Sequence, residues 1–339
     1  MALIRIRELT TVFGPDPQAG LGLWRQGLDK AALHARGHVL ALQDVSLDVN
    51  AGEIFVIMGL SGSGKSTLVR HINGLLAPTA GRVFVGEQEL TALGAAALRS
   101  LRRERLAMVF QRFGLLAHRS VIDNVAFGLE LRGVAPAERH ERARRWIARV
   151  GLAGWEQHRP AQLSGGMQQR VGLARALCSD TDIILMDEAF SALDPLIRSQ
   201  LQAELLTLQA ELGRSIVFIT HDLDEALRIG SRVAVLRDGA VLQVGTPREL
   251  LLQPADAHVA AFVADVNRAR ALTVDAALAP WPQGEPWPAL ERAVDASATL
   301  EQVLPRLVGR QSPLPVRRGG AIVGQVALDQ VRAILAPQD

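Results

Sequence analysis

The chain has 339 residues, 48% of them hydrophobic, which is enough for one large domain and a smaller module with a substantial buried core. Its formal net charge is only +2, and acidic residues interleave with the arginines of residues 99–105 and 139–149, which argues against a nucleic-acid-binding protein. No apolar run approaches the roughly 18 residues of a membrane helix, residues 1–7 alternate apolar and basic side chains, and Cys178 has no partner for a disulfide. We therefore expect a soluble protein of the cytoplasm.

Apolar periodicity predicts short strands that alternate with helices, which is typical of an α/β fold with parallel strands. An insert at residues 14–37 interrupts this pattern. In it Leu21, Trp24, Leu28 and Ala32 recur at helical spacing, which predicts one amphipathic helix packed on its own domain. The other expected elements are strands at 1–13, 39–49, 54–58, 183–186 and 216–219, a hairpin at 233–244, and helices over most of 86–160.

A glycine-rich segment follows the expected strand at 54–58. Its sequence, GLSGSGKST, matches the phosphate-binding pattern G-x-x-x-x-G-K-[ST], and a helical run follows it. Glycines let consecutive backbone N–H groups converge on phosphate oxygens, and the helix N-terminus adds a positive dipole end. We expect Lys65 to reach the β- and γ-phosphates of ATP and Ser66 to bind Mg²⁺. The candidate nucleotide-binding residues are Gly59, Ser61, Gly62, Ser63, Gly64, Lys65, Ser66 and Thr67.

Two carboxylates follow the apolar strand at 183–186. This strand delivers Asp187 and Glu188 to the sheet edge where ligands bind in open α/β sheets. We expect Asp187 to hold Mg²⁺ through water, and Glu188 to act as the general base that polarises the attacking water.

Residues 163–170, LSGGMQQR, resemble the signature motif of the ABC-transporter ATPases. The resemblance implies a P-loop NTPase of the ABC ATPase type, with a mixed-sheet core and a helical subdomain. It also implies a head-to-tail homodimer that sandwiches two ATP molecules, in which the signature helix of one subunit contacts the γ-phosphate held by the other. The residues implied to contact nucleotide in trans are Ser164, Gly165, Gly166, Gln168 and Asp194.

The other motifs of this family occur in order. Gln111 looks like the Q-loop glutamine, which contacts Mg²⁺ and senses the γ-phosphate, and residues 191–194 look like the D-loop. His221 looks like the switch histidine and would orient water beside Glu188. The groove at residues 111–116 is expected to receive a cytoplasmic helix of the permease.

Four segments narrow the resemblance to quaternary-amine uptake systems. They are VFGPDP at 12–17, residues 52–61, residues 120–128, and residues 186–198 with their Ala189-Phe190 pair. The resemblance implies the ATP-hydrolysing subunit of an importer for glycine betaine, proline betaine or choline. Such a subunit binds permease subunits at the cytoplasmic face of the inner membrane, and an extracytoplasmic binding protein supplies the solute. An importer of another small solute and a soluble ABC ATPase outside transport remain alternatives.

The C-terminal part changes in composition. Residues 277–288 carry four prolines and two tryptophans, and residues 293–330 predict strand, helix, strand, strand and helix, similar to one CBS motif. Because Ala327 and Gln330 replace the usual hydroxyl and acid, we favour a structural or dimer-stabilising tail over nucleotide or ionic-strength sensing. The expected domains are an ABC ATPase at 1–268 with a helical subdomain at about 90–178, a linker at 269–291, and a CBS-like α+β module at 292–339.

The adenine contact departs from the family pattern. Many of these ATPases stack adenine on an aromatic side chain ahead of the phosphate loop, but this chain has no Tyr. Alignment with the family places Arg36 near that position, and a guanidinium can stack on a base. Trp24 is the other candidate.

Overall fold

The computed structural model describes residues 2–110, 114–191, 193–282, 286, 288–310 and 312–336. The chain forms two compact units, Met1–Val244 and Gly245–Asp339. The predicted ATPase domain extends further, to residue 268, and that domain assignment stays a prediction.

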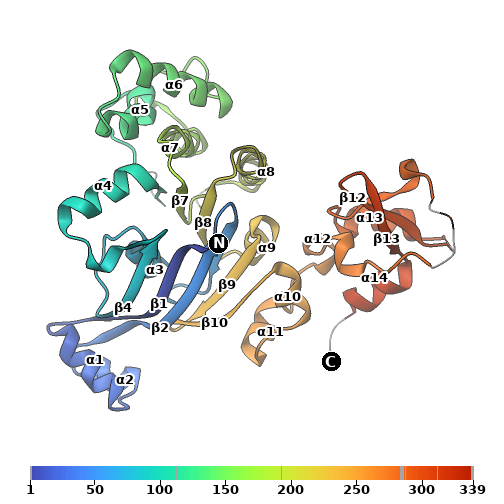
Figure 1. Ribbon diagram of the computed structural model, residues 1–339, viewed down its shortest axis with the longest axis horizontal. Coiled ribbons are helices and arrows are strands. Elements are labelled where there is room, and N and C mark those ends of the chain that lie inside the picture. Colours follow the sequence, from blue (N-terminus) through green and yellow to red (C-terminus); the bar gives the residue numbers. More distant parts are fainter. Residues whose placement is uncertain are drawn as a thin grey trace. The chain divides into compact units, whose positions relative to one another are not determined.

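Two sheets build the first unit (Figure 1). One is antiparallel in the order β2-β1-β4-β5, and the other has the order β10-β9-β3-β8-β7-β6 with parallel pairing from β9 to β6. Strands β3, β7 and β8 are buried along their whole length, which explains their almost unbroken apolar sequences. The strands are β1 Ala2–Phe13, β2 Val39–Asn50, β3 Ile54–Met58, β4 Ala80–Val85, β5 Gln88–Glu89, β6 Leu106–Val109, β7 Ile183–Asp187, β8 Ser215–Thr220, β9 Arg232–Arg237 and β10 Ala240–Gly245.

One hydrophobic core joins the two sheets. It combines Ile6 of β1, Val49 of β2, Ile57 of β3 and Val217 of β8 with Leu68 of α3 (Lys65–Ile72), all within 0% to 1% exposed. Helix α3 is therefore fixed by both sheets, and it carries the end of the phosphate loop with it. All strands predicted from the sequence in this unit, including the hairpin of β9 and β10, are confirmed.

The helices predicted over most of 86–160 are confirmed by α4, α5 and α6, although strand β6, which was not predicted, interrupts them. A further helix, α7, precedes β7, and the four helices lie between β5 and β7. They are α4 Ala95–Arg105, α5 Val121–Leu131, α6 Pro136–Arg149 and α7 Gly165–Cys178. Helices α5, α6 and α7 have their own core, and Figure 1 shows them grouped together in green. Helix α5 approaches the end of α7 closely, because a Cβ added at Gly128 would lie less than 3.0 Å from Ser179 Oγ.

The insert differs from the prediction of a single helix. It forms two short helices, α1 Pro17–Arg25 and α2 Lys30–Ala35, and the chain turns between them at Gly27, which has a φ of 95°. The expected packing on its own domain is confirmed, because Leu21 and Leu33 are buried against Val12 and Leu40. Apolar spacing across the break concealed the turn.

The remaining helices of the first unit are α8 Pro195–Leu212 and α9 Leu223–Ile229. Asp194 caps α8 and Asp222 caps α9, each with a carboxylate that accepts a backbone N–H from the first turn. Among the described residues, no helix is both long enough and apolar enough to cross a membrane.

The second unit contains the predicted order of strand, helix, strand, strand and helix. Strand β11 pairs in parallel with β12, which pairs antiparallel with β13. Ala279 pairs with Gln325 of β13, and only glycine fits at 324, because a Cβ there would lie less than 3.0 Å from Ala279 O. The elements are α10 Pro247–Leu252, α11 Ala257–Val263, α12 Arg268–Ala271, β11 Val294–Asp295, α13 Leu300–Leu307, β12 Leu314–Arg318, β13 Ala321–Val326 and α14 Leu328–Leu335.

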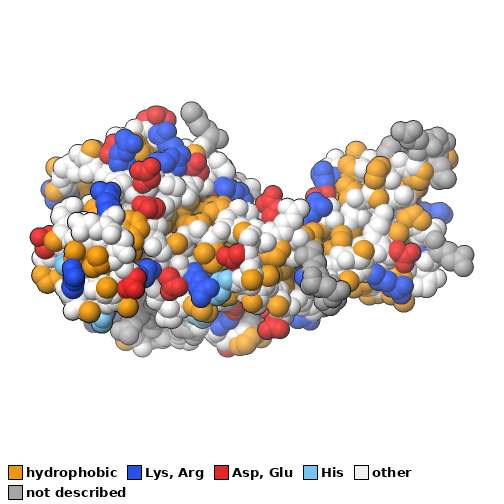
Figure 2. Space-filling view, turned by 90° about the horizontal axis from the view of Figure 1, so that it is seen from below, with side chains coloured by type: hydrophobic (Ala, Val, Ile, Leu, Met, Phe, Trp, Pro, Cys, Tyr) orange, Lys and Arg blue, Asp and Glu red, His pale blue; other side chains and the backbone are white. Residues whose placement is uncertain are grey.

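Charged side chains of both signs share the surface. On α6, Arg142 pairs with Glu138 at 2.6 Å, and Arg145 pairs with Glu141 one turn further along the exposed face. On the face drawn in Figure 2, basic side chains lie beside acidic ones over much of the surface. The expected solvated helix face of mixed charge is confirmed for α6.

Candidate functional site

The glycine-rich loop joins β3 to α3 and needs its glycines. Gly59, Gly62 and Gly64 have φ values of 153°, 80° and 100°. A Cβ added at Gly59 would lie less than 3.0 Å from Leu236 O, and one at Gly64 would lie 2.8 Å from Ala41 O. The backbone is thus held between β9 and β2 in a conformation that residues other than glycine rarely adopt.

Lys65 folds back over this loop. Its Nζ donates hydrogen bonds to Gly59 O at 2.8 Å and Leu60 O at 2.9 Å, and the residue is only 5% exposed. Burial lowers the pKa of Lys65, while the nearby carboxylates of Glu188 and Asp187 raise it. The ammonium lies among backbone carbonyls that phosphate oxygens can replace as acceptors.

Unlike the Lys65 ammonium, one buried hydroxyl in the same loop lacks a hydrogen-bond partner in the described part of the chain. Ser63 is 5% exposed, and its Oγ has no hydrogen-bond partner among the described residues. Buried polar groups are rarely left unpaired, and a phosphate oxygen would satisfy this one. The neighbouring Ser61 is exposed, and Thr67 is partly buried in the first turn of α3.

Ser66 and Asp187 bring two oxygen atoms together. Ser66 Oγ donates to Asp187 Oδ1 at 3.1 Å, and Asp187 is 9% exposed at the end of β7. Burial raises the pKa of Asp187, and the Ser66 hydroxyl opposes that shift. These oxygens suit Mg²⁺, which binds one or two protein oxygens together with phosphate and water. Within the part of the chain that the structure describes, no group of three or more His, Cys, Asp or Glu could hold a metal by itself.

Glu188 and His221 lie side by side next to Asp187. His221 Nδ1 is 3.4 Å from Glu188 Oε1, and the side chains are 55% and 19% exposed respectively. Glu188 has a φ of 45°, and its N–H donates to Ile219 O of β8 at 3.1 Å. Left-handed backbone at a non-glycine residue costs of order 1 kcal/mol and is common at functional sites. The pair can position a water molecule and accept its proton.

The signature residues open helix α7. Ser164 Oγ accepts from Met167 N at 3.3 Å, and no atom lies within 4 Å of a Cβ added at Gly165. Gln168 instead donates to Pro160 O at 3.0 Å and Leu163 O at 3.3 Å in its own loop. The structure therefore joins the phosphate loop, Asp187, Glu188 and His221 in one place. Among the residues that the structure describes, no hydrogen bond links Ser164 or Gln168 to Lys65 or Ser66. A Cβ added at Gly166 would lie 3.2 Å from Ile197 Cγ2.

Arg198 is a residue to which the sequence motifs gave no role. Its guanidinium donates to Asp222 Oδ2 at 3.2 Å and to Leu193 O at 3.1 Å. It thus ties residues 191–194 to the segment that begins at His221. The only sequence signal for Arg198 was its place in the first turn of the helix capped by Asp194.

The predicted ligand Gln111 lies outside the described residues.

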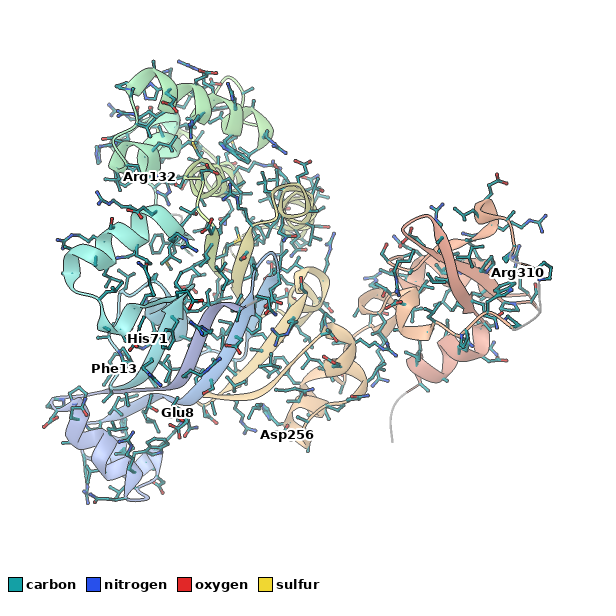
Figure 3. All side chains as sticks on the ribbon, viewed as in Figure 1. Glu8, Phe13, His71, Arg132, Asp256 and Arg310 are labelled. Carbon is teal, nitrogen blue, oxygen red and sulfur yellow. The ribbon has the colours of Figure 1, made fainter. Side chains whose placement is uncertain are left out.

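Phe13 is an exposed aromatic side chain to which the sequence motifs gave no role. It lies at the end of β1, 42% exposed, and pairs with Val39 of β2, which is 48% exposed (Figure 3). Val39 lies two residues before Ala41 in β2, and the carbonyl oxygen of Ala41 lies against Gly64 of the phosphate loop. Arg36 is exposed where α2 ends, and its adenine contact remains a prediction. An aromatic residue closing the strand before the insert was the available signal.

A groove of about 260 Å³ lies between the parallel sheet and the helical group. Phe110 is 40% exposed at its edge, and Arg175 Nη1 donates to Gly114 O at 2.7 Å. Burial lowers the pKa of Arg175. The lining residues are Leu106, Ala107, Met108, Phe110, Gly114, Leu116, Phe127, Gly128, Arg175, Ala176 and Ser179.

Comparison with protein families and curated proteins gives concordant matches. Residues 42–191 match the family described as ABC transporter. The chain is 49% identical over 271 residues to the glycine betaine transport ATP-binding protein OpuAA of Bacillus subtilis, covering 80% of this chain and 65% of that one. It is 44% identical over 336 residues to the glycine betaine/proline betaine transport system ATP-binding protein ProV of Escherichia coli, covering 99% and 83%.

Two further matches extend this comparison. The trimethylamine N-oxide transport system ATP-binding protein TmoW of Ruegeria pomeroyi is 46% identical over 333 residues, which is 98% of this chain and 96% of that one. Among solved structures, the dimeric post-hydrolysis state of the ATP-binding cassette MJ0796 with ADP and Pi matches with a TM-score of 0.62 and 31% identity. That match covers 72% of this chain and 98% of the cassette.

Proposed function

Because the chain belongs to the ABC transporter family of ATP-binding proteins, we propose that it is the ATP-hydrolysing subunit of an importer for a betaine-type solute. The solute class is glycine betaine, proline betaine or choline. The observation that carries the ATPase assignment is the single site formed by Lys65, Ser66 with Asp187, and Glu188 with His221. The solute class is supported by 44% identity to ProV across 99% of the chain, the tail included.

The site residues divide the work of phosphoryl transfer to water. Lys65 exchanges its two loop carbonyls for oxygens of the β- and γ-phosphates, and the backbone N–H groups of the phosphate loop hold the rest. Ser66 and Asp187 would hold Mg²⁺, which neutralises charge on the transferring phosphate. Glu188 orients the attacking water and accepts its proton. His221 contacts the γ-phosphate and holds the Glu188 carboxylate in place beside it.

The second half of each site comes from another copy of the chain. The N-terminus of α7, with Ser164, Gly165 and Gly166, is an exposed helix end that favours an anion. Within the described part of one copy no hydrogen bond joins this helix end to Lys65, which fits use in trans by a head-to-tail homodimer. Gln168 and Asp194 are assigned to the same interface, although in one copy their side chains bond locally.

The groove beside Phe110 is assigned to the permease. Its lining is mostly apolar and lies between the sheet and the helical group, so a helix inserted there would move when the dimer closes. The subunit would thus sit peripherally at the cytoplasmic face of the inner membrane, and the solute would reach the permease from an extracytoplasmic binding protein.

Reconstitution tests the proposal. The chain is purified together with its permease subunits and placed in proteoliposomes with the matching solute-binding protein. We expect ATP-dependent uptake of labelled glycine betaine, lost in Lys65→Ala. Uptake of labelled methionine serves as the control. ATP hydrolysis without any uptake of methylated amines would contradict the solute class, and absence of hydrolysis would contradict the enzyme.

Trimethylamine N-oxide is the second candidate solute. The chain spans 96% of TmoW, against 83% of ProV, at similar identity. Both solute types carry a methylated cationic nitrogen, which aromatic cages of binding proteins recognise. Competition between unlabelled trimethylamine N-oxide and labelled glycine betaine in the same proteoliposomes decides between them.

A further inference from the structure

Lys30 and Lys65 are the only lysines in a chain whose other basic side chains are arginine and histidine. Lys65 belongs to the phosphate loop, whereas Lys30 begins helix α2 of the insert. The Nζ of Lys30 donates a hydrogen bond to the carbonyl oxygen of Asp238, 208 residues further along the chain. Burial lowers the pKa of Lys30, and the charge of Asp238 opposes that shift.

The acceptor of this bond lies in the tight turn between β9 and β10. Asp238 and Gly239 have φ values of 48° and 76°, so both are left-handed. A non-glycine residue keeps this conformation only where its surroundings hold it. Two side chains hold the Asp238 carbonyl, namely Lys30 and Gln43, whose Nε2 donates at 3.1 Å.

The turn between β9 and β10 also supports the phosphate loop. Gly239 N donates to Ser63 O at 3.0 Å, and Gly239 O accepts from Gln43 N at 2.9 Å. Just before the turn, Leu236 O lies so close to Gly59 that no side chain fits there. Both the start and the middle of the phosphate loop therefore rest on backbone that belongs to β9 and its turn.

We propose that Lys30 is a positioning residue for nucleotide binding, which couples the N-terminal insert to the phosphate loop through the carbonyl of Asp238. This inference rests on the proposed function, because it assumes that residues 59–67 bind the phosphates of ATP. Loss of the ammonium frees the turn, and the N–H groups of the loop then converge less well on phosphate. Affinity falls for ATP and ADP alike, while the hydrolytic residues Glu188 and His221 keep their places.

The test compares Lys30→Met with Gln18→Ala. Gln18 is a matched control, because its Nε2 joins the other insert helix to Thr79 O at 3.0 Å and does not touch the turn. Losing one charge-assisted bond should raise the Kd for ATP and for ADP by about threefold to tenfold in Lys30→Met, with kcat unchanged. We expect Gln18→Ala to match the wild type, and Lys30→Arg to restore most of the affinity because a guanidinium also donates to a carbonyl.

Two controls keep the outcomes separate. Gln43→Leu removes the other side-chain donor to Asp238 and should weaken ATP binding too, with a combined effect that is not additive with Lys30→Met. A Kd within twofold of the wild type in Lys30→Met, or an equal loss in Gln18→Ala, overturns the inference. Lys65→Ala is measured in parallel: unchanged ATP binding in that variant overturns the proposed function itself, whereas lost binding there with normal binding in Lys30→Met overturns only the role of Lys30.

Discussion

At the scale of single residues, Glu188 gives the most direct test of the chemistry. Replacing it by Gln keeps the shape but removes the proposed proton acceptor, so we expect ATP to bind normally while kcat falls by about 10²- to 10⁴-fold. Steady-state phosphate release and ATP titration measure the two effects, and a nucleotide-trapped dimer should accumulate on size exclusion. Glu211→Gln, on the exposed end of α8, serves as the control. Normal turnover of Glu188→Gln would mean that another group accepts the proton.

The adenine contact is also decided by single residues. Phe13 is an exposed aromatic at the end of β1, and Arg36 is an exposed cation at the end of α2. Stacking of a base on a side chain contributes about 1–3 kcal/mol. Changing the stacking residue to Ala should therefore lower the affinity of the protein for ATP by about tenfold or more. We expect this loss in Phe13→Ala, with Phe13→Trp close to the wild type. If Arg36→Ala alone weakens binding, the guanidinium is the stacking group.

A buried histidine sets a pH dependence of stability. His71 is 1% exposed, its Nε2 lies 2.8 Å from Thr11 Oγ1, and its Nδ1 lies 3.0 Å from Leu76 O. Burial lowers the pKa of His71 below its ordinary value of 6.5. The unfolded chain therefore binds the proton first, so this contribution to stability is complete above pH 6.5 and is lost as the pH falls below it.

Urea unfolding between pH 5 and pH 8 measures this dependence. The wild type should lose stability more steeply below pH 6.5 than His71→Gln, which cannot titrate. His34→Gln removes a ring from the exposed face of α2 and is the control. Equal slopes for the wild type and His71→Gln would show that the buried ring does not govern acid unfolding.

At the scale of elements, the sequence predicted what local chemistry determines. The phosphate loop was recognisable because its glycines lie against backbone atoms that leave no room for a Cβ. Strands β3, β7 and β8 were recognisable because full burial requires continuous apolar sequences. The break of the insert at Gly27 was missed, because apolar spacing continues across it. Contacts such as that of Arg198 with Asp222 depend on which loops the sheet brings together, and periodicity carries no such information.

The packing of α5 against the end of α7 makes a prediction for these elements. A Cβ at Gly128 would collide with Ser179, so we expect Gly128→Ala to lower the free energy of unfolding by about 1–3 kcal/mol. Gly22→Ala in α1 is the matched control, since no atom lies within 4 Å of a Cβ added at Gly22 and Ala favours a helix. Chemical denaturation measures both. A neutral Gly128→Ala would mean that the two helices separate without cost.

At the scale of the whole molecule, the proposed mechanism builds each complete site from two copies of the chain. One copy gathers Lys65, Asp187, Glu188 and His221, but its Ser164 caps its own helix, with no hydrogen bond to the phosphate loop. An anion site at an exposed helix end is incomplete until phosphate arrives from elsewhere. The proposed mechanism therefore separates binding, which one copy performs, from hydrolysis, which requires a closed dimer.

Mixing two inactive variants tests this division directly. Lys65→Ala and Ser164→Ala should each be nearly inactive alone, because each homodimer has the same defect in both sites. In a mixed dimer, one site carries both changes, while the other receives Lys65 from one copy and Ser164 from its partner and is intact. We therefore expect ATPase activity to reappear on mixing, and its amount to follow the fraction of mixed dimer. If mixing restores nothing although mixed dimers form, then either hydrolysis needs both sites at once or Ser164 acts within its own copy. A tandem fusion of two copies with a single Ser164→Ala change separates these. It should be inactive if hydrolysis needs both sites at once, whereas the copy that keeps its serine should still hydrolyse ATP if Ser164 acts within its own copy.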